Sequence, residues 1–180
     1  MKNIILKNGL ISGFMVSAIL LISMNYYSYC NGNVSEGVSM LIGFSSMILA
    51  FSFIFLGIRK YRDVNQYGKI TFGKALVIGL GIALIASTMY VVTWLFYYNY
   101  FNPDFLEKYQ EMQLATLKNS GASLAEIQQK KEEMELFGEK YKNPIFNVLI
   151  TYTEILPIGI LVSIISAWIL KKNNEYYRYL

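Results

Sequence analysis

Residues 38–98 read VSMLIGFSSMILAFSFIFLGI (38–58), RKYRDVNQYGKITFGK (59–74) and ALVIGLGIALIASTMYVVTWLFYY (75–98), and this stretch decides the fold. Each outer segment is close to the roughly 20 apolar residues that a helix needs to cross the hydrocarbon core of a bilayer. The segment between them carries one acid, Asp63, and five bases: Arg59, Lys60, Arg62, Lys69 and Lys74. An excess of bases in a short connector indicates the cytoplasmic side. The stretch therefore predicts two transmembrane helices joined by a cytoplasmic connector.

The composition of the whole chain also indicates a membrane protein. Its 180 residues are 54% hydrophobic and 16% charged, whereas soluble domains contain about 25% charged residues. This length predicts a single domain over residues 1–180. The net charge of +4 is compatible with nucleic-acid binding, but the bases cluster at the ends of apolar runs. Bases in those positions determine membrane topology, so no nucleic-acid partner is expected.

Two further apolar runs complete a set of four predicted spans, at about residues 8–27, 38–58, 74–98 and 145–170. The first run follows Lys2 and Lys7, as a signal peptide would, but residues 25–30 contain no small-x-small cleavage site. We therefore expect an uncleaved first span. Cys30, the single cysteine, has no lipobox before it and is expected to be an interfacial thiol. Residues 173–180 are expected to lie along the lipid headgroups.

Residues 99–144 form a polar insert with eight acids and six bases. Asn102 and Pro103 are typical of a helix start, as N-cap and first helical residue, and this helix should reach about residue 118. Ser123 and Glu126 form the pattern of a capping box for a second helix, which should reach about residue 141. The apolar stripes predict that the two helices pack on each other as an αα-hairpin. A coiled coil with a partner is the alternative, but each helix has only about two heptads.

The distribution of bases predicts the orientation in the membrane. Four spans place both termini on the side of the 59–74 connector, and ten bases lie on that side. The first loop has no base, and the insert has more acids than bases. The positive-inside rule therefore predicts cytoplasmic termini and an extracytoplasmic insert at 99–144. Aromatic residues near the outer ends of spans one and three predict an interfacial belt: Tyr26, Tyr27, Tyr29, Trp94, Phe96, Tyr97, Tyr98, Tyr100 and Phe101.

Small residues recur at four-residue spacing on three spans and are candidate helix-packing positions. They are Gly9 and Gly13 on span one, Ala75, Gly79, Ala83 and Ser87 on span three, and Gly159, Ser163 and Ala167 on span four. Such ridges let transmembrane helices approach closely. We expect them to pack within one four-helix bundle. The second interpretation assigns one ridge to a homo-oligomer or to a larger protein partner.

Arg59, Arg62 and Asp63 are candidate functional residues in the basic connector. Two guanidinium groups could bind a phosphate or a lipid headgroup. The simpler interpretation is a topology anchor among anionic lipids. Because Arg62 and Asp63 are adjacent, their side chains should point in different directions on a helix and need not pair.

Glu154 is the one acidic residue inside a predicted span, and Pro157 lies three residues after it. Proline has no N–H, so the carbonyl of Thr153 should lose its helical partner. An intramembrane acid beside a freed carbonyl is typical of ion and proton pathways. Glu154 nevertheless lies 17 residues before Lys171, about 25 Å along a helix, which places it near the outer boundary. We therefore favour an interfacial carboxylate with a structural role over a transport or catalytic role.

Several ordered motifs of this chain resemble the domain-of-unknown-function family 4199. They are GIRKYRD at 57–63, GKITFGKA at 68–75, Ser87-x-x-Tyr90-Val91-x-x-Trp94, NPDF at 102–105, SGAS at 120–123 and EILPIG at 154–159. The resemblance implies a small four-span protein of a bacterial inner membrane with a periplasmic insert. It brings no assigned activity and no catalytic residues.

The sequence predicts an all-α membrane protein without enzymatic activity. The chain has no histidine and only one cysteine, and neither a metal-ligand cluster nor a nucleophile paired with a base is present. No cofactor or metal is expected. The leading hypothesis is an interaction or scaffold component of the inner membrane, which contacts lipid and a membrane or periplasmic protein. The alternative is a small oligomeric channel or transporter with Glu154 in a polar pathway.

Overall fold

A computed structural model describes residues 1–29 and 36–172, with the side chains of residues 27, 28, 36, 38 and 39 left aside. The predictions for Cys30 and for the tail at 173–180 fall outside these residues. No strand occurs in the described part of the chain, which agrees with the all-α prediction. The helices are α1 (Lys2–Tyr29), α2 (Glu36–Lys60), α3 (Phe72–Tyr100), α4 (Phe105–Asn119), α5 (Leu124–Tyr141) and α6 (Pro144–Leu170).

The helices α1, α2, α3 and α6 are long and apolar enough to cross a membrane. Each extends beyond the span predicted for it, and α1 begins six residues earlier, at Lys2. The lengthening is expected, because a helix continues until a cap or a turn ends its backbone hydrogen bonds, and not where apolar residues end. The chain is thus a multi-pass membrane protein whose apolar helices contact the lipid bilayer.

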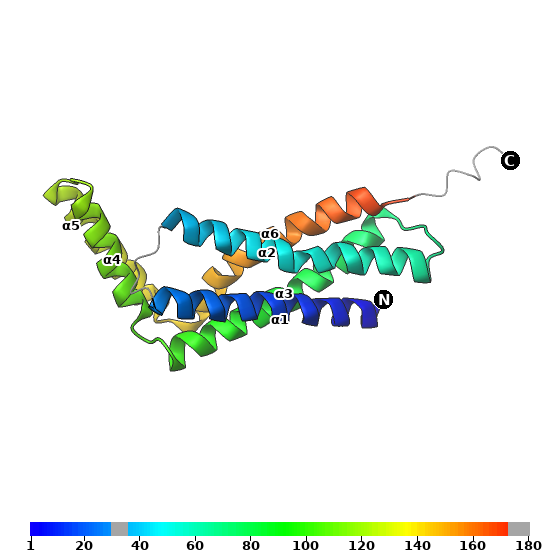
Figure 1. Ribbon diagram of the computed structural model, residues 1–180, viewed down its shortest axis with the longest axis horizontal. Coiled ribbons are helices and arrows are strands. Elements are labelled where there is room, and N and C mark those ends of the chain that lie inside the picture. Colours follow the sequence, from blue (N-terminus) through cyan, green and yellow to red (C-terminus); the bar gives the residue numbers. More distant parts are fainter. Residues whose placement is uncertain (30–35, 173–180) are drawn as a thin grey trace.

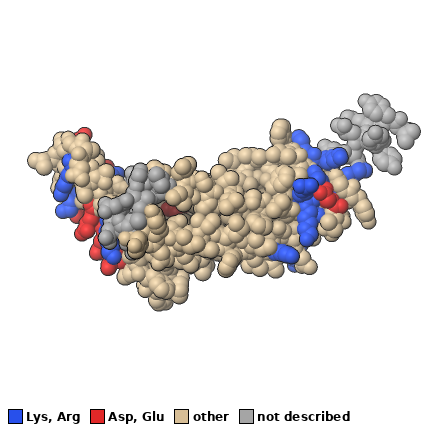
Figure 2. Space-filling view, in the orientation of Figure 1, with Lys and Arg blue, Asp and Glu red and all other residues tan. Residues whose placement is uncertain are grey.

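The four long helices run side by side, and α4 and α5 project from one end of them (Figure 1). Contacts join α1 to α2 and α3, and α6 to α2 and α3. Figure 2 shows charged side chains at both ends of the molecule, mainly bases with some acid at one end and mixed charges at the other, with a wide, mostly uncharged surface between them. We call these the connector end, where residues 61–71 lie, and the α4–α5 end.

Side-chain caps begin three of the helices. The Thr71 hydroxyl accepts a hydrogen bond from the Lys74 backbone N–H at 3.4 Å, and Ser123 and Glu126 form the predicted capping box of α5. Asn143 accepts hydrogen bonds from two N–H groups at the start of α6, where Pro144 is the first residue. The capping box of α5 agrees with the predicted pattern, because it depends on neighbours within three residues.

The predicted start of the first insert helix is wrong by about two residues. Asn102 is not its N-cap, and Pro103 is not its first residue, because α4 begins at Phe105. The carbonyl of Asn102 instead accepts a hydrogen bond from the Phe105 N–H at 3.1 Å. This turn brings Phe105 against the ring of Trp94, where the two rings meet edge to face with centroids 5.1 Å apart. Tertiary packing has therefore displaced the helix start.

Two backbone hydrogen bonds join the connector to the end of α6. The N–H of Ile70 donates to the carbonyl of Lys172 at 3.2 Å, and the N–H of Lys172 donates to the carbonyl of Ile70 at 2.9 Å. Between α2 and this bridge, the chain forms a π-helical turn, Tyr61–Asn65. The tight turn that follows uses positive φ angles at Tyr67 and Gly68. The sequence gives no local signal for the bridge, since its partners are about a hundred residues apart.

Candidate functional site

Glu154 lines a cavity of about 340 Å³ at the α4–α5 end of the long helices. The side chain is exposed, and no described residue gives it a hydrogen bond or an ion pair. The other lining residues come from α1, α3, α4 and α5, and six of them are aromatic: Tyr90, Trp94, Phe105, Tyr109, Phe137 and Tyr141. A single carboxylate therefore lies in a wall made mainly of aromatic rings.

A buried hydrogen bond fixes α5 to α3 at this cavity. The indole N–H of Trp94 donates to the Tyr141 hydroxyl at 2.8 Å, and Trp94 is only 7% exposed. Burial raises the pKa of Tyr141 to about 12, and the nearby charge of Glu154 acts in the same direction. The neutral hydroxyl is thus the form that accepts from Trp94. Trp94 was predicted to lie in an interfacial belt, but it is buried because α4 and α5 cover it.

The long helices are closed on the connector side of the cavity. Phe51, Ile54, Ile82 and Ala83 have no exposed surface, and Ile155, next to Glu154, has none either. Two buried hydroxyls in this region bind backbone, since the Ser12 hydroxyl donates to the Ala50 carbonyl at 2.7 Å and the Ser163 hydroxyl donates to the Gly159 carbonyl at 2.7 Å. The buried Ser87 hydroxyl has no hydrogen-bond partner among the described residues. The described interior on this side is therefore packed mainly with apolar side chains.

Pro157 does not join Glu154 in the cavity. It lies on the exposed side of α6, and α6 continues through it from Pro144 to Leu170. The Thr153 hydroxyl donates to the Ile150 carbonyl at 2.6 Å. The structure therefore places the two candidate residues on one helix but in different surroundings.

The basic connector differs from the prediction at one point. Arg62 pairs with its neighbour Asp63, with Nε and Oδ1 2.7 Å apart, and Arg59 Nε lies 3.7 Å from Asp63 Oδ2. The expectation that Arg62 and Asp63 need not pair is wrong, because a long guanidinium side chain can reach the adjacent carboxylate in this π-helical turn. Both arginines contact one carboxylate through Nε, and the Arg59 side chain is 60% exposed. Exposed pairs of this kind contribute little stability.

The small residues predicted for helix packing are all buried within the chain. They are Gly9, Gly13, Ala75, Gly79, Ala83, Ser87, Gly159, Ser163 and Ala167. A Cβ placed on Gly79 would meet Ser163 at 2.9 Å, and one placed on Gly159 would meet Ala83 at 2.9 Å. Gly9 and Gly13 of α1 lie in the same way against Ile85 and Met89 of α3. These ridges pack one helix of the chain against another.

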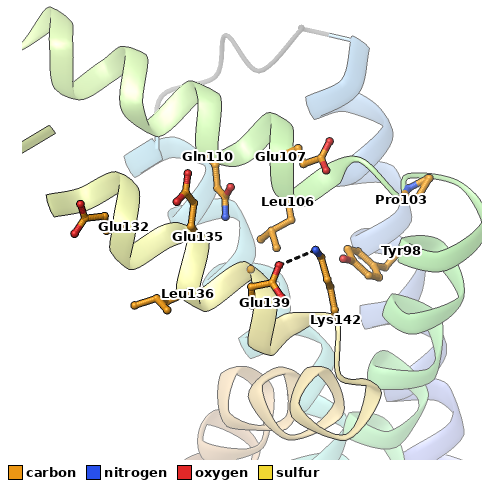
Figure 3. Close-up of a pocket in the computed structure, with 11 residues that line it drawn as sticks. Tyr98, Pro103, Leu106, Glu107, Gln110, Glu132, Glu135, Leu136, Glu139 and Lys142 are labelled. Carbon is orange, nitrogen blue, oxygen red and sulfur yellow. Dashed lines mark hydrogen bonds and ion pairs between the residues drawn. The ribbon is translucent and has the colours of Figure 1, made fainter. Parts of the chain in front are cut away.

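A second cavity, of about 680 Å³, is a groove on the α4–α5 pair (Figure 3). Its lining includes four carboxylates, Glu107, Glu132, Glu135 and Glu139, and one amine, Lys142. Lys142 Nζ lies 2.9 Å from Glu139 Oε1, and this contact raises the pKa of Lys142. The helices that form the groove are held together by the amide of Gln110, which donates to the Met134 carbonyl at 2.6 Å. The groove is preformed and carries excess negative charge.

Sequence reasoning missed the aromatic wall around Glu154. Tyr90, Trp94, Phe105 and Tyr141 come from three helices, and no spacing rule relates them. One signal in the sequence indicated it: Phe105 and Phe137 lie on the apolar faces of two helices, and apolar faces must pack against another part of the molecule. The sequence could show that these faces exist, but only the fold shows that they cover Glu154.

The family model described as "Protein of unknown function (DUF4199)" matches residues 7–172. No curated protein and no solved structure matches the chain.

Proposed function

The chain therefore belongs to the DUF4199 family, and we propose that it is a non-enzymatic interaction component of a bacterial inner membrane. The termini and the 59–74 connector lie in the cytoplasm, and the α4–α5 pair lies in the periplasm. The bases gathered at the connector end support this orientation. The pair contacts a membrane or periplasmic protein and holds it beside the bilayer.

The observation that carries this proposal is the groove of Figure 3 on a pair of helices that is fixed in place. The Trp94–Tyr141 hydrogen bond holds α5 against α3, so a partner bound in the groove would have a defined position relative to the membrane. Binding to a preformed surface avoids the cost of ordering that surface. Four carboxylates against one amine favour a partner segment with exposed bases.

A photo-crosslinking residue at Leu136, which lines the groove and is 65% exposed, tests the proposal in intact cells. We expect a discrete crosslinked protein, and we expect Glu132→Lys with Glu135→Lys to remove it by reversing the charge. A crosslinker at Ala115, which is exposed on α4 and does not line the groove, is the matched control. Equal crosslinking from Leu136 and Ala115, or crosslinking that survives the charge reversal, contradicts the proposal.

Glu154 supports a second candidate function, an oligomeric transporter, because an unpaired carboxylate lines a cavity at the end of a span. The closed packing below the cavity favours the interaction protein over this alternative. Proton flux in proteoliposomes separates the two. A flux that requires the chain and is abolished by Glu154→Gln would favour the transporter, whereas no flux above that of empty liposomes would favour the interaction protein.

A further inference from the structure

The cavity at Glu154 adjoins a second, apolar cavity of about 400 Å³ between α1 and α2. Five residues line both cavities: Leu20, Met24, Tyr90, Phe105 and Tyr109. The remaining lining of the second cavity is mainly apolar and includes Ile22 and Ile42, which are 68% and 46% exposed. The combined space therefore has a carboxylate at one end and an apolar groove at the other. Its groove opens on the surface of two candidate membrane spans.

The charged residues that line this space determine whether it favours a cationic or an anionic ligand. Glu154 is the one acidic side chain that lines either cavity, and neither lining contains a lysine or arginine in the described part of the chain. Aromatic rings attract cations through their negative faces, and clusters of them bind quaternary ammonium groups. A hard metal cation would need several oxygen ligands, and the walls offer one carboxylate among rings.

We infer that this space binds an amphiphile with an organic cation at its head, a primary to quaternary amine, and a single alkyl chain as its body. The head lies against Glu154 and the rings of Tyr90, Trp94 and Tyr141, and the chain lies in the α1–α2 groove. Each cavity alone is near the lower limit of the 300–1,000 Å³ that is usual for small-molecule sites, and together they fit a head and a chain. Leu106 lines both this site and the groove of the proposed function, but Glu154 and the rings of Tyr90, Trp94 and Tyr141 do not line that groove, so the inference does not depend on the proposed function.

Tryptophan fluorescence of the full chain in lipid nanodiscs tests the inference. The chain has two tryptophans, so Trp168→Phe leaves Trp94, in the cavity wall, as the reporter. We expect decyltrimethylammonium to change the Trp94 emission saturably above the response of empty nanodiscs, and decyl sulfate, with the same chain, not to do so. In this background, Glu154→Gln should weaken binding of the cation at least about ten-fold, because it removes the charge that complements the head.

Two matched variants separate the head from the chain. Glu111→Gln removes an exposed carboxylate of α4 that lines neither cavity, and binding should be unchanged. Gly43 lines the groove, and a Cβ added there meets nothing within 4 Å, so Gly43→Leu should fill groove space without a clash. It should weaken binding of decyltrimethylammonium and leave binding of butyltrimethylammonium unchanged.

Labelling of the parent protein with a hydrophobic carbodiimide makes the test independent of the folding of the Glu154→Gln variant. Decyltrimethylammonium should slow modification of Glu154, measured by mass spectrometry, and decyl sulfate should not. An equal response to the cation and the sulfate, a Glu154→Gln affinity equal to that of the parent, or absence of protection overturns the inference.

Discussion

Two buried serines on α1 and α3 differ in the partners of their hydroxyls. Ser12 and Ser87 both have no exposed surface. The Ser12 hydroxyl donates to the Ala50 carbonyl across the α1–α2 contact, whereas the Ser87 hydroxyl has no hydrogen-bond partner among the described residues. A buried hydroxyl without a partner costs free energy, and a bonded one contributes modestly. Substitution by alanine should therefore lower the free energy of unfolding at Ser12 but not at Ser87.

We predict that Ser87→Ala leaves the free energy of unfolding unchanged or raises it, because it removes an unsatisfied polar atom. Ser12→Ala should lower that free energy by about 0.6 kcal/mol, the average for a hydrogen bond between transmembrane helices. Reversible unfolding by dodecyl sulfate in bicelles, followed by tryptophan fluorescence, measures both. A greater loss for Ser87→Ala than for Ser12→Ala would show that the Ser87 hydroxyl has a partner in the membrane.

The hydrogen bonds of Glu126 predict that the stability of the first turn of α5 depends on pH. Its carboxylate accepts hydrogen bonds from the Ser123 N–H and hydroxyl, both at 2.8 Å, and these lower the pKa of Glu126 below its usual value. A carboxyl with a lowered pKa stabilises the folded state above its unfolded pKa, and this contribution is lost as pH falls through the folded value.

The first turn of α5 should thus become more mobile below about pH 4.5, the ordinary value for this carboxyl. A nitroxide at Leu124→Cys in a Cys30→Ser background reports that mobility by electron paramagnetic resonance. Glu126→Gln should remove the pH dependence. If both proteins respond to pH alike, the capping box does not control this turn.

At the scale of elements, α3 and α6 interlock through small residues. The contacts Gly79–Ser163 and Ala83–Gly159 are four residues apart on each helix and run in opposite directions along the chain, as expected for an antiparallel pair. Helices approach this closely only where side chains are small. A larger side chain in the seam should separate the two helices.

We predict that Ala83→Leu lowers the free energy of unfolding by about 1–3 kcal/mol, the usual cost of overpacking. Ala83 has no exposed surface, while Leu84 is 54% exposed on the neighbouring face. Leu84→Ala should therefore have a smaller effect, because lipid surrounds either side chain equally well. Thermal unfolding in detergent compares the two. Equal losses would mean that Ala83 does not face another helix.

Local sequence signals predicted the elements better than the contacts between them. Ser123 and Glu126 belong to one turn, so their spacing alone indicates the cap. The pairing of Trp94 with Tyr141 spans 47 positions, and no periodic pattern encodes it. The same reason explains the site: Glu154 stood out as a charge within an apolar run, but its aromatic neighbours come from helices whose packing the sequence does not specify.

At the scale of the whole molecule, the described charges gather at two ends separated by an uncharged surface (Figure 2). The separation agrees with an apolar layer between two aqueous sides. The excess of bases at the connector end predicts that this end lies in the cytoplasm.

Accessible cysteines test this orientation in a Cys30→Ser background. Tyr67 lies in the connector and is 93% exposed. In spheroplasts, the cysteine of a Tyr67→Cys variant should resist a membrane-impermeant thiol reagent. The cysteine of a Ser120→Cys variant, between α4 and α5, should react with it. Permeabilised cells, in which both should react, are the control. The reverse pattern in spheroplasts would invert the topology.

The bridge between Ile70 and Lys172 joins the start of α3 to the end of α6, so that residues 70–172 form a closed ring. This ring does not include α2, and a covalent link to α2 is not needed to close it. The turn at Tyr67 and Gly68 lies just outside that ring and is exposed at its tip, where chain breaks are best tolerated. The protein should therefore work by fragment complementation. Separately expressed pieces 1–66 and 67–180 should reassemble in the membrane, with a tag on one recovering the other, and a break inside the ring, between α4 and α5, should reassemble less well.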